Sequence, residues 1–274
     1  MIVDGRAVTT EILAHVFLET EKRQRRPLVR AIVIQPSSAT ESYLSIKQKR
    51  ALEAGMDLEL VRMESDATEE DILHKIELPG ADSIIVQLPL PGTMNTERIL
   101  SSIPLSKDAD VLSLEAHRRF EEGEEYTLLP PVVGAVKEIL ERSAVTLTNK
   151  KVYVIGRGRL VGEPIARWLE QQGALVTIFT KEDGDLNELK NAEIIVSGAG
   201  QGGIIKPEHL MPGVVLIDAG TSESGGSIVG DADPSCADIA SVFTPVPGGV
   251  GPVAVACLFK NVASLVARQH LQTP

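Results

Sequence analysis

Short apolar runs rich in β-branched residues alternate along the chain with stretches of helical periodicity. In the first half, residues 28–34, 57–62 and 83–88 are predicted as buried strands, and residues 38–54 and 67–77 as the helices between them. Continuous apolar strands separated by helices are typical of parallel sheets that are covered on both faces. The hydrophobic pattern therefore predicts an α/β fold.

The same alternation returns in the second half after one interruption. Residues 104–131 show little periodicity and hold an acidic stretch and a Pro-Pro pair, so we expect a domain boundary there. A last helix, from about residue 253, follows a Gly/Pro-rich segment. The further strands are expected at 151–155, 174–179, 193–197 and 214–218.

We therefore expect two α/β domains, each with a parallel sheet. The first covers residues 1–113 and the second, a Rossmann-like dinucleotide-binding domain, covers residues 114–252. The C-terminal helix 253–274 is expected to pack back on the first domain.

Composition excludes several function classes. The 274 residues are 43% hydrophobic and carry a formal net charge of -11 without any basic run, which argues against nucleic-acid binding. No apolar run approaches the roughly 18 residues that span a bilayer, and the N-terminus is too charged for a secretory signal. Cys236 and Cys257 lack disulfide or metal-ligand spacing. We expect a cytoplasmic protein with no membrane partner, no nucleic-acid partner and no metal.

Candidate chemistry in the first half lies on one helix and two loops. Tyr43 and Lys47 are four residues apart and share a helix face, where a lysine in an apolar cleft can exchange protons near neutrality. Spacing alone favours a solvated helix face with a chance Tyr–Lys pair. Gln87 is placed at the carboxyl end of a strand, where it could hydrogen-bond Lys47 and favour its neutral form, and Asp110 lies on an irregular loop.

The second half contains a glycine pattern typical of nucleotide binding. Strand 151–155 leads into Gly156-Arg157-Gly158 and a helix begins near Gly162, a setting in which backbone N–H groups approach a pyrophosphate. After the next strand the chain has Lys181 rather than the acid that reads a 2′-hydroxyl, so NADP is favoured over NAD.

With these residues in hand, the chain resembles the bifunctional methylenetetrahydrofolate dehydrogenase/methenyltetrahydrofolate cyclohydrolase (FolD) family. The most specific segments are the QLPLP segment and the Pro-Gly-Gly-Val-Gly-Pro loop. The matching segments occur in the family's order and are SATESYLSIKQK (38–49), IIVQLPLP (84–91), IPLSKDAD (103–110), IGRGRLVGEP (155–164), IVGDADP (228–234) and TPVPGGVGP (244–252).

The resemblance implies a two-domain enzyme with folate bound between a catalytic domain and a dinucleotide domain. It makes Lys47 the central catalytic residue, assisted by Gln87, with Tyr43 stacked on the aminobenzoyl ring and Asp110 on the pterin. The substrate-binding residues it implies are Tyr43, Lys47, Val86, Gln87, Leu88, Asp110, Pro247, Gly248 and Gly249. The cofactor-binding residues expected are Gly156, Arg157, Gly158, Lys181, Thr221, Val250 and Gly251.

The implied reaction oxidises 5,10-methylenetetrahydrofolate to the methenyl form with NADP and then hydrolyses it to 10-formyltetrahydrofolate. Tetrahydrofolate one-carbon derivatives are therefore the expected small-molecule partners, and the family implies a homodimer. The chain departs from the family pattern at Val111, where the family has glycine, at Gly158, at Lys181 and at Ala254. These departures leave two alternatives open: a cyclohydrolase with a degenerate cofactor site, and a non-catalytic folate- or nucleotide-binding relative.

Overall fold

The structure is a computed structural model of the chain, and it describes residues 1–36, 38–180 and 185–271. Two compact units are present, each assembled from two separate stretches of the chain. The domain boundaries expected from the sequence stay a prediction. The Lys47 unit comprises Thr10–Pro131 and Val255–Pro274, and the Gly156 unit comprises Met1–Thr9 and Val132–Ala254.

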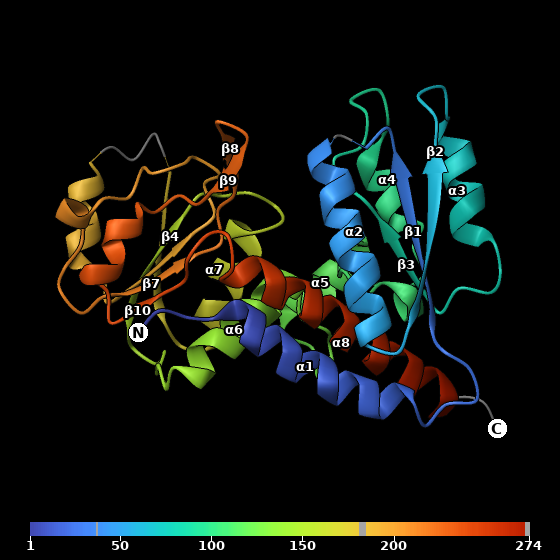
Figure 1. Cartoon of the computed structure of the whole chain (residues 1–274), viewed down its shortest axis with the longest axis horizontal. Coiled ribbons are helices and arrows are strands. Elements are labelled where there is room, and N and C mark those ends of the chain that lie inside the picture. The colour runs from blue at the N-terminus through green and yellow to red at the C-terminus, as the bar shows by residue number, and fades with distance from the viewer. Residues whose placement is uncertain (37, 181–184, 272–274) are drawn as a thin grey trace. The chain divides into compact units, whose positions relative to one another are not determined.

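The Lys47 unit is built on a three-stranded parallel sheet. Its strands are β1 (Leu28–Ile34), β2 (Asp57–Met63) and β3 (Ser83–Val86), in the order β2-β1-β3. The connecting helices are α2 (Ser38–Glu53) and α3 (Glu69–Glu77), labelled with the strands in Figure 1. Strands separated by helices are thus confirmed, and the α/β class with them.

Burial within this sheet follows strand position. The central strand β1 is buried along almost its whole length, as expected of a strand covered on both faces. The expectation of a buried strand at 57–62 was wrong, because β2 is an edge strand whose residues alternate between exposed and half-buried. Strand β3 ends at Val86, two residues earlier than expected, so Gln87 is the first residue after it.

The interval 104–131 is more regular than its sequence pattern indicates. It contains a short 3₁₀ turn at Leu105–Lys107 and the helix α5 (Leu114–Glu122). Only Ala116 and Phe120 of α5 are buried, and a surface lattice of Arg and Glu side chains covers the rest. Such a charged helix has too few apolar positions to show a clear period. The helix α4 (Thr96–Ser101) precedes this interval.

The Gly156 unit contains a five-stranded parallel sheet in the order β10-β7-β6-β4-β5. In order along the chain this is 2-1-3-4-5, one of the two common doubly wound arrangements, so a Rossmann-like sheet is confirmed. The strands are β4 (Lys151–Ile155), β5 (Leu175–Phe179), β6 (Ile194–Ser197), β7 (Val215–Asp218) and β10 (Val242–Phe243).

Helices and short turns complete this unit. The helix α7 (Gly162–Gln171) connects β4 to β5, and α6 (Pro131–Arg142) precedes β4. The other elements are a hairpin of β8 (Ser222–Ser224) and β9 (Ser227–Val229), and 3₁₀ turns at Leu186–Asn191, Pro207–His209 and Pro234–Asp238.

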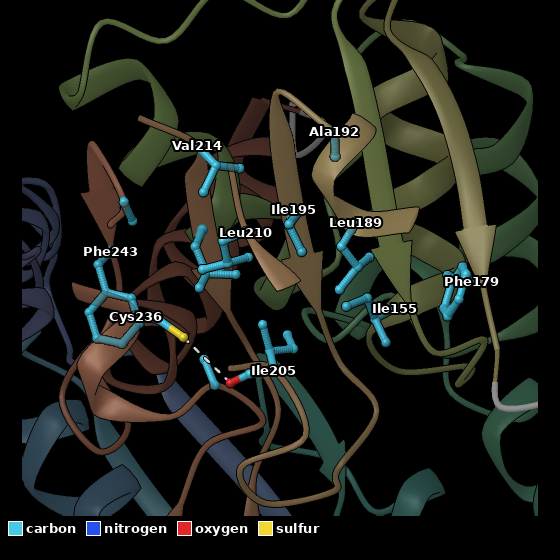
Figure 2. Packing of buried hydrophobic residues seen from close by; sticks show 13 residues of the cluster. Ile155, Phe179, Leu189, Ala192, Ile195, Ile205, Leu210, Val214, Cys236 and Phe243 are labelled. Carbon is cyan, nitrogen blue, oxygen red and sulfur yellow. Dashed lines mark hydrogen bonds between the residues drawn. The ribbon is translucent and has the colours of Figure 1, made fainter. Parts of the chain in front are cut away.

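One face of the five-stranded sheet carries a continuous apolar core. Figure 2 shows this cluster, in which Ile155, Ile195 and Phe243 come from three different strands. Cys236 lies in the same cluster and donates a weak hydrogen bond to the Ile205 carbonyl at 3.4 Å. Burial raises the pKa of its thiol to about 11, so it behaves as a small hydrophobic residue.

Two helices have several residues in each unit. They are α1 (Gly5–Thr20) and α8 (Val250–Leu271). Among the described residues, α8 is the one helix long and apolar enough to pass a length-and-composition test for a membrane span, with a mean hydropathy of 1.7 from Val250 to Gln269. The expectation that no apolar stretch reaches this length was therefore too strict. Because 61% of its most apolar window is buried, α8 has the burial of a core helix.

Candidate functional site

Lys47 and Gln87 meet at the carboxyl end of β3. The Lys47 Nζ donates to the Gln87 Oε1 at 2.9 Å, and both side chains are half-buried. The orientation of the amide is fixed because its Nε2 donates to the Leu88 carbonyl at 2.8 Å. Gln87 thus presents a carbonyl oxygen to the amine. A protonated and a neutral lysine can both donate to it, so this bond does not by itself favour the neutral form.

Asp110 lies in the electrostatic field of this pair. Burial raises the pKa of its carboxyl, the nearby Lys47 opposes that shift, and Asp108 adds to it. A carboxyl group in this position can hold a proton more readily than an exposed one. It is therefore suited to recognise a ring edge that offers both a donor and an acceptor.

The loop that carries Asp110 is held firmly. The buried Asp108 carboxylate accepts from the backbone N–H groups of Leu112 at 3.2 Å and Ser113 at 2.7 Å. Val111 has φ +58° and is buried, a conformation that costs a β-branched residue about 1–2 kcal/mol. The surrounding bonds maintain this strained backbone directly beside Asp110.

The other substrate residues expected in this unit take different positions. Tyr43 lies one turn before Lys47 on α2 and is half-buried. Val86, the last residue of β3, is 1% exposed and belongs to the apolar core of this unit. Leu88 packs against the same core. Val86 can therefore contact a ligand through its backbone only.

Gly156 forms the tight turn between β4 and α7. It has φ +96°, and a methyl group added to Gly162 would lie 2.0 Å from the Gly156 carbonyl oxygen. Gly156 also packs against Gly198, which follows β6. The turn therefore stands between β4 and β6, the point where the order of the sheet reverses and where ligands of doubly wound sheets bind.

The remaining residues expected to hold the cofactor lie around this turn. Arg157 and Gly158 are exposed, and apart from the adjacent residues no described part of the chain lies within 4 Å of the position of a Gly158 side chain, so the turn is open to that extent. Thr221 is exposed in the loop after β7. Lys181 lies outside the described residues.

The Gly/Pro-rich loop at 244–252 ends in the first turn of α8. Its tight packing is visible at Gly249, whose N–H donates to the Pro245 carbonyl at 2.7 Å, and Gly248 has φ +115°. Val250 and Gly251 are helical, and the Val250 side chain is buried. Pro247 is exposed. Val250 can thus reach a ligand only through its backbone at the start of a helix.

Two further residues in the Gly156 unit were missed at the sequence level. Asp218 ends β7 and Asp231 follows the hairpin, and both carboxyl groups are buried. The available signal was an acid that directly follows an apolar strand, and a second acid after a glycine. Their partners lie up to 34 residues away, so the sequence alone does not show what they bind.

Family models match both the part of the chain that contains Lys47 and the part that contains Gly156. Residues 3–110 match the family model described as tetrahydrofolate dehydrogenase/cyclohydrolase, catalytic domain, and residues 130–270 match that of the same family's NAD(P)-binding domain. The chain belongs to the tetrahydrofolate dehydrogenase/cyclohydrolase family. Tyr43, Lys47, Gln87 and Asp110 fall within the catalytic-domain match of this family.

Individual relatives are similar to this chain over nearly its whole length. The bifunctional protein FolD of Brevibacillus brevis is 33% identical over 99% of this chain and 99% of its own. The Campylobacter jejuni FolD methylenetetrahydrofolate dehydrogenase/cyclohydrolase structure is 28% identical, with a TM-score of 0.93 over 98% of this chain and 99% of that one. The Trypanosoma brucei FolD structure, complexed with NADP and an inhibitor, is 32% identical with a TM-score of 0.91, over 100% of this chain and 99% of that one.

Membership in the tetrahydrofolate dehydrogenase/cyclohydrolase family accounts for both halves of the chain. The family's NAD(P)-binding domain includes the Gly156 turn and the five-stranded sheet. Its match also extends over most of α8, although residues from 255 onward pack in the Lys47 unit. Within the described residues, no group of three or more His, Cys, Asp or Glu side chains is arranged to hold a metal ion.

Proposed function

We propose that this chain oxidises 5,10-methylenetetrahydrofolate to 5,10-methenyltetrahydrofolate with NADP, and then hydrolyses the product to 10-formyltetrahydrofolate. Both domains of the tetrahydrofolate dehydrogenase/cyclohydrolase family are present over nearly the whole chain. The observation that carries the catalytic part is the Lys47–Gln87 hydrogen bond at the carboxyl end of β3, with Asp110 in the field of Lys47.

The first step removes a hydride from the one-carbon bridge of the folate. NADP supplies the acceptor for this hydride when it is bound. The folate product is a methenyl cation, whose charge is shared by the two nitrogen atoms that flank the carbon. Lys47 and Gln87 hold the reacting end of the folate, so the bridge is oriented rather than free to rotate.

The second step adds water to the methenyl carbon and opens the ring. A proton must leave the attacking water, and a proton must reach the ring nitrogen that departs. Lys47 is the group that performs these transfers, because its Nζ is half-buried and already held in one direction by the Gln87 carbonyl. Gln87 acts by fixing the position of that amine.

Folate recognition in this proposal rests on Asp110 and Tyr43. Asp110, with its raised pKa, binds the polar edge of the pterin, while Tyr43 on α2 stacks on the aminobenzoyl ring. Pro247, Gly248 and Gly249 of the family's NAD(P)-binding domain complete the folate site. Val86 and Leu88 support the site from the core beneath Gln87.

Cofactor binding rests on the Gly156 turn. The positive φ of Gly156, its close approach to Gly162 and the open side at Gly158 fit a turn whose N–H groups receive a pyrophosphate. Arg157 is exposed beside it, available for the 2′-phosphate of NADP. Thr221, Val250, Gly251 and Lys181 complete the proposed cofactor site; Lys181 is assigned from sequence alone.

A spectrophotometric assay of the purified chain tests the function directly. With methylenetetrahydrofolate as substrate, we expect reduced nicotinamide to accumulate faster with NADP than with NAD, and little methenyl intermediate to build up. Reduction absent with both cofactors, together with hydrolysis of added methenyltetrahydrofolate, would reduce the function to cyclohydrolase alone. Absence of both activities would leave a non-catalytic relative.

The role of Lys47 is tested by Lys47→Ala. We expect kcat of the cyclohydrolase to fall at least about a hundredfold, because the proton-transfer group is lost, while the melting temperature changes little. The matched control is Lys49→Ala on the exposed face of the same helix, which should retain full turnover. Unchanged hydrolysis in Lys47→Ala would contradict the mechanism.

Further features belong to the same proposal. The folate-binding catalytic domain covers residues 1–113, joined by the C-terminal helix from residue 253, and the NAD(P)-binding domain covers residues 114–252. The chain acts as a cytoplasmic homodimer formed through the NAD(P)-binding domain. In support of the dimer, β5 is an edge strand of its sheet and its Leu175 is 56% exposed. A monomeric mass in light scattering would contradict the dimer.

A further inference from the structure

Two buried aspartates at the carboxyl edge of the five-stranded sheet have no part in the proposed chemistry. Asp218 is 1% exposed and Asp231 is 0% exposed. Burial of a carboxyl group is costly unless hydrogen bonds replace its water. The hydrogen-bond donors to Asp231 therefore indicate which part of the chain its carboxylate holds in place.

Asp231 accepts hydrogen bonds from the segment that follows β6. Its Oδ2 accepts from the Ser197 hydroxyl at 2.6 Å, from the Ala199 N–H at 2.7 Å and from the Gly200 N–H at 3.3 Å. Its Oδ1 accepts from the Gln201 N–H at 2.7 Å. One carboxylate thus binds three successive backbone N–H groups and fixes the course of a loop that has no regular structure of its own.

This loop is the surface against which the Gly156 turn packs. A methyl group added to Gly156 would lie 2.8 Å from the Gly198 carbonyl oxygen and 3.1 Å from the Ala199 Cα. The Gly198 N–H in turn donates to the Ile155 carbonyl at 2.8 Å. Displacement of the loop that Asp231 holds would therefore move the turn between β4 and β6.

The loop after β7 is fixed by the same group. A methyl group added to Gly220 would lie 2.1 Å from the Asp231 carboxylate, and one added to Gly230 would lie 2.2 Å from Asp218 Oδ2. The Asp231 carboxylate thus packs against Gly220, which lies two residues after Asp218. The Asp218 carboxylate packs against Gly230, which directly precedes Asp231. Asp231 therefore sets the positions of Gly220 and the adjoining Thr221 as well.

We propose that Asp231 is a positioning residue for the dinucleotide cofactor. Its carboxylate holds the loops after β6 and β7 against the Gly156 turn, and so maintains the switch point of the sheet in a form that binds NADP. This inference rests on the proposed function for the identity of the cofactor.

The test is Asp231→Asn, which keeps the volume but replaces one acceptor oxygen with an NH₂ group. We expect the KM for NADP and the Kd for NADPH, followed by nicotinamide fluorescence, to rise at least roughly tenfold. Hydrolysis of methenyltetrahydrofolate requires no cofactor, so its kcat/KM should stay within about twofold. An unchanged Kd for NADPH, or an equal loss of both activities without a change in Kd, would overturn the proposal.

The matched control is Asp233→Asn, two residues further along. The Asp233 side chain accepts from the Ser235 N–H at 2.9 Å at the start of a 3₁₀ turn, and the residue reaches the segment after β6 through its backbone N–H, which donates to the Ile205 carbonyl at 2.8 Å and is kept in the variant. It should leave the NADPH Kd unchanged. If the wild-type chain shows no activity with any folate, the proposed function fails, whereas NADPH binding by wild type and variants still decides the role of Asp231.

Hydrogen exchange gives a readout that needs no cofactor. In Asp231→Asn, the amides of Ala199, Gly200 and Gln201 should lose protection while amides in the core of β4 keep theirs. Ser197→Ala provides a gentler variant, because it removes one donor and leaves the carboxylate in place. It should weaken NADPH binding less than Asp231→Asn does; no weakening in either variant would contradict the inference.

Discussion

At the residue scale, the buried carboxyl groups of Asp108, Asp218 and Asp231 each accept hydrogen bonds from backbone N–H groups. Among these groups, Asp218 has a pKa that burial shifts strongly. It accepts from the N–H groups of Gly220 at 3.0 Å and Ala232 at 2.8 Å, and it lies near Asp231. Burial raises its pKa from the ordinary value of 3.8 to about 7, and the charge of Asp231 adds to this effect.

A pH dependence of stability follows from Asp218. Between pH 3.8 and about 7 the folded chain retains a proton that the unfolded chain releases, so this group's contribution to stability is lost as the pH rises. We predict that the stability of the wild type relative to Asp218→Asn falls by roughly 1 kcal/mol per pH unit from pH 5 to 7 and levels off above that range.

Urea denaturation at a series of pH values measures this difference. Exposed carboxylates with lowered pKa values, such as Asp71 beside Thr68, act in the opposite direction but are common to both proteins and cancel. A difference that does not change with pH would show that Asp218 titrates alike in the folded and unfolded chain.

At the scale of elements, a left-handed glycine follows several of the helices. The left-handed residue after a helix is Gly55 after α2, Gly123 after α5 and Gly173 after α7. After α6 the same position holds Ala144, with φ +53°. There the Val145 N–H donates to the Leu140 carbonyl at 3.0 Å, which closes a Schellman motif.

Ala144→Gly should therefore stabilise the chain. We expect a gain of about 0.5–1 kcal/mol in the free energy of unfolding, because the left-handed conformation costs alanine more than the extra freedom of glycine costs in the unfolded state. The matched control is Ala14→Gly in the exposed interior of α1, which should lose a similar amount. Destabilisation in both variants would show that the end of α6 does not depend on this residue.

The elements also show what the sequence can and cannot predict. Strands such as β1 and β7 are buried on both faces, so their apolar runs stand out, and Gly55 marks the end of α2 directly. The helix α5 was not predicted, because its two buried residues lie among many charged ones. The Lys47–Gln87 contact was expected from a helix face and a strand end. The loop held by Asp231 was not, because a side chain that binds distant N–H groups leaves no periodic trace.

At the scale of the whole molecule, each unit combines two stretches that are far apart in the sequence. Asn261 of α8 illustrates this for the Lys47 unit. Its Nδ2 donates to the Ala109 carbonyl at 2.9 Å and to the Leu129 carbonyl at 2.8 Å, and the side chain is 9% exposed. One amide from the last helix thus holds the loop that presents Asp110.

Asn261→Ala should combine a loss of stability with a loss of folate binding. We expect the free energy of unfolding to fall by about 1–3 kcal/mol, because the buried Ala109 carbonyl and the half-buried Leu129 carbonyl lose their donor. We also expect the KM for methenyltetrahydrofolate to rise while the Kd for NADPH stays unchanged. The control is Ser264→Ala, whose hydroxyl donates only to Lys260 of its own helix. A change in NADPH binding alone would contradict this assignment.

The division of α8 between the units has a consequence for how the chain is made. The Gly156 unit needs residues up to Ala254, and the Lys47 unit needs residues from Val255 onward, although its sheet is complete by Val86. During synthesis from the N-terminus, the first sheet therefore emerges from the ribosome long before α8, whose Asn261 and Gln269 donate to the Ala109 and Asp82 carbonyls of this unit. The loop that presents Asp110 is therefore held by its α8 donor only after the whole of the Gly156 unit has been translated.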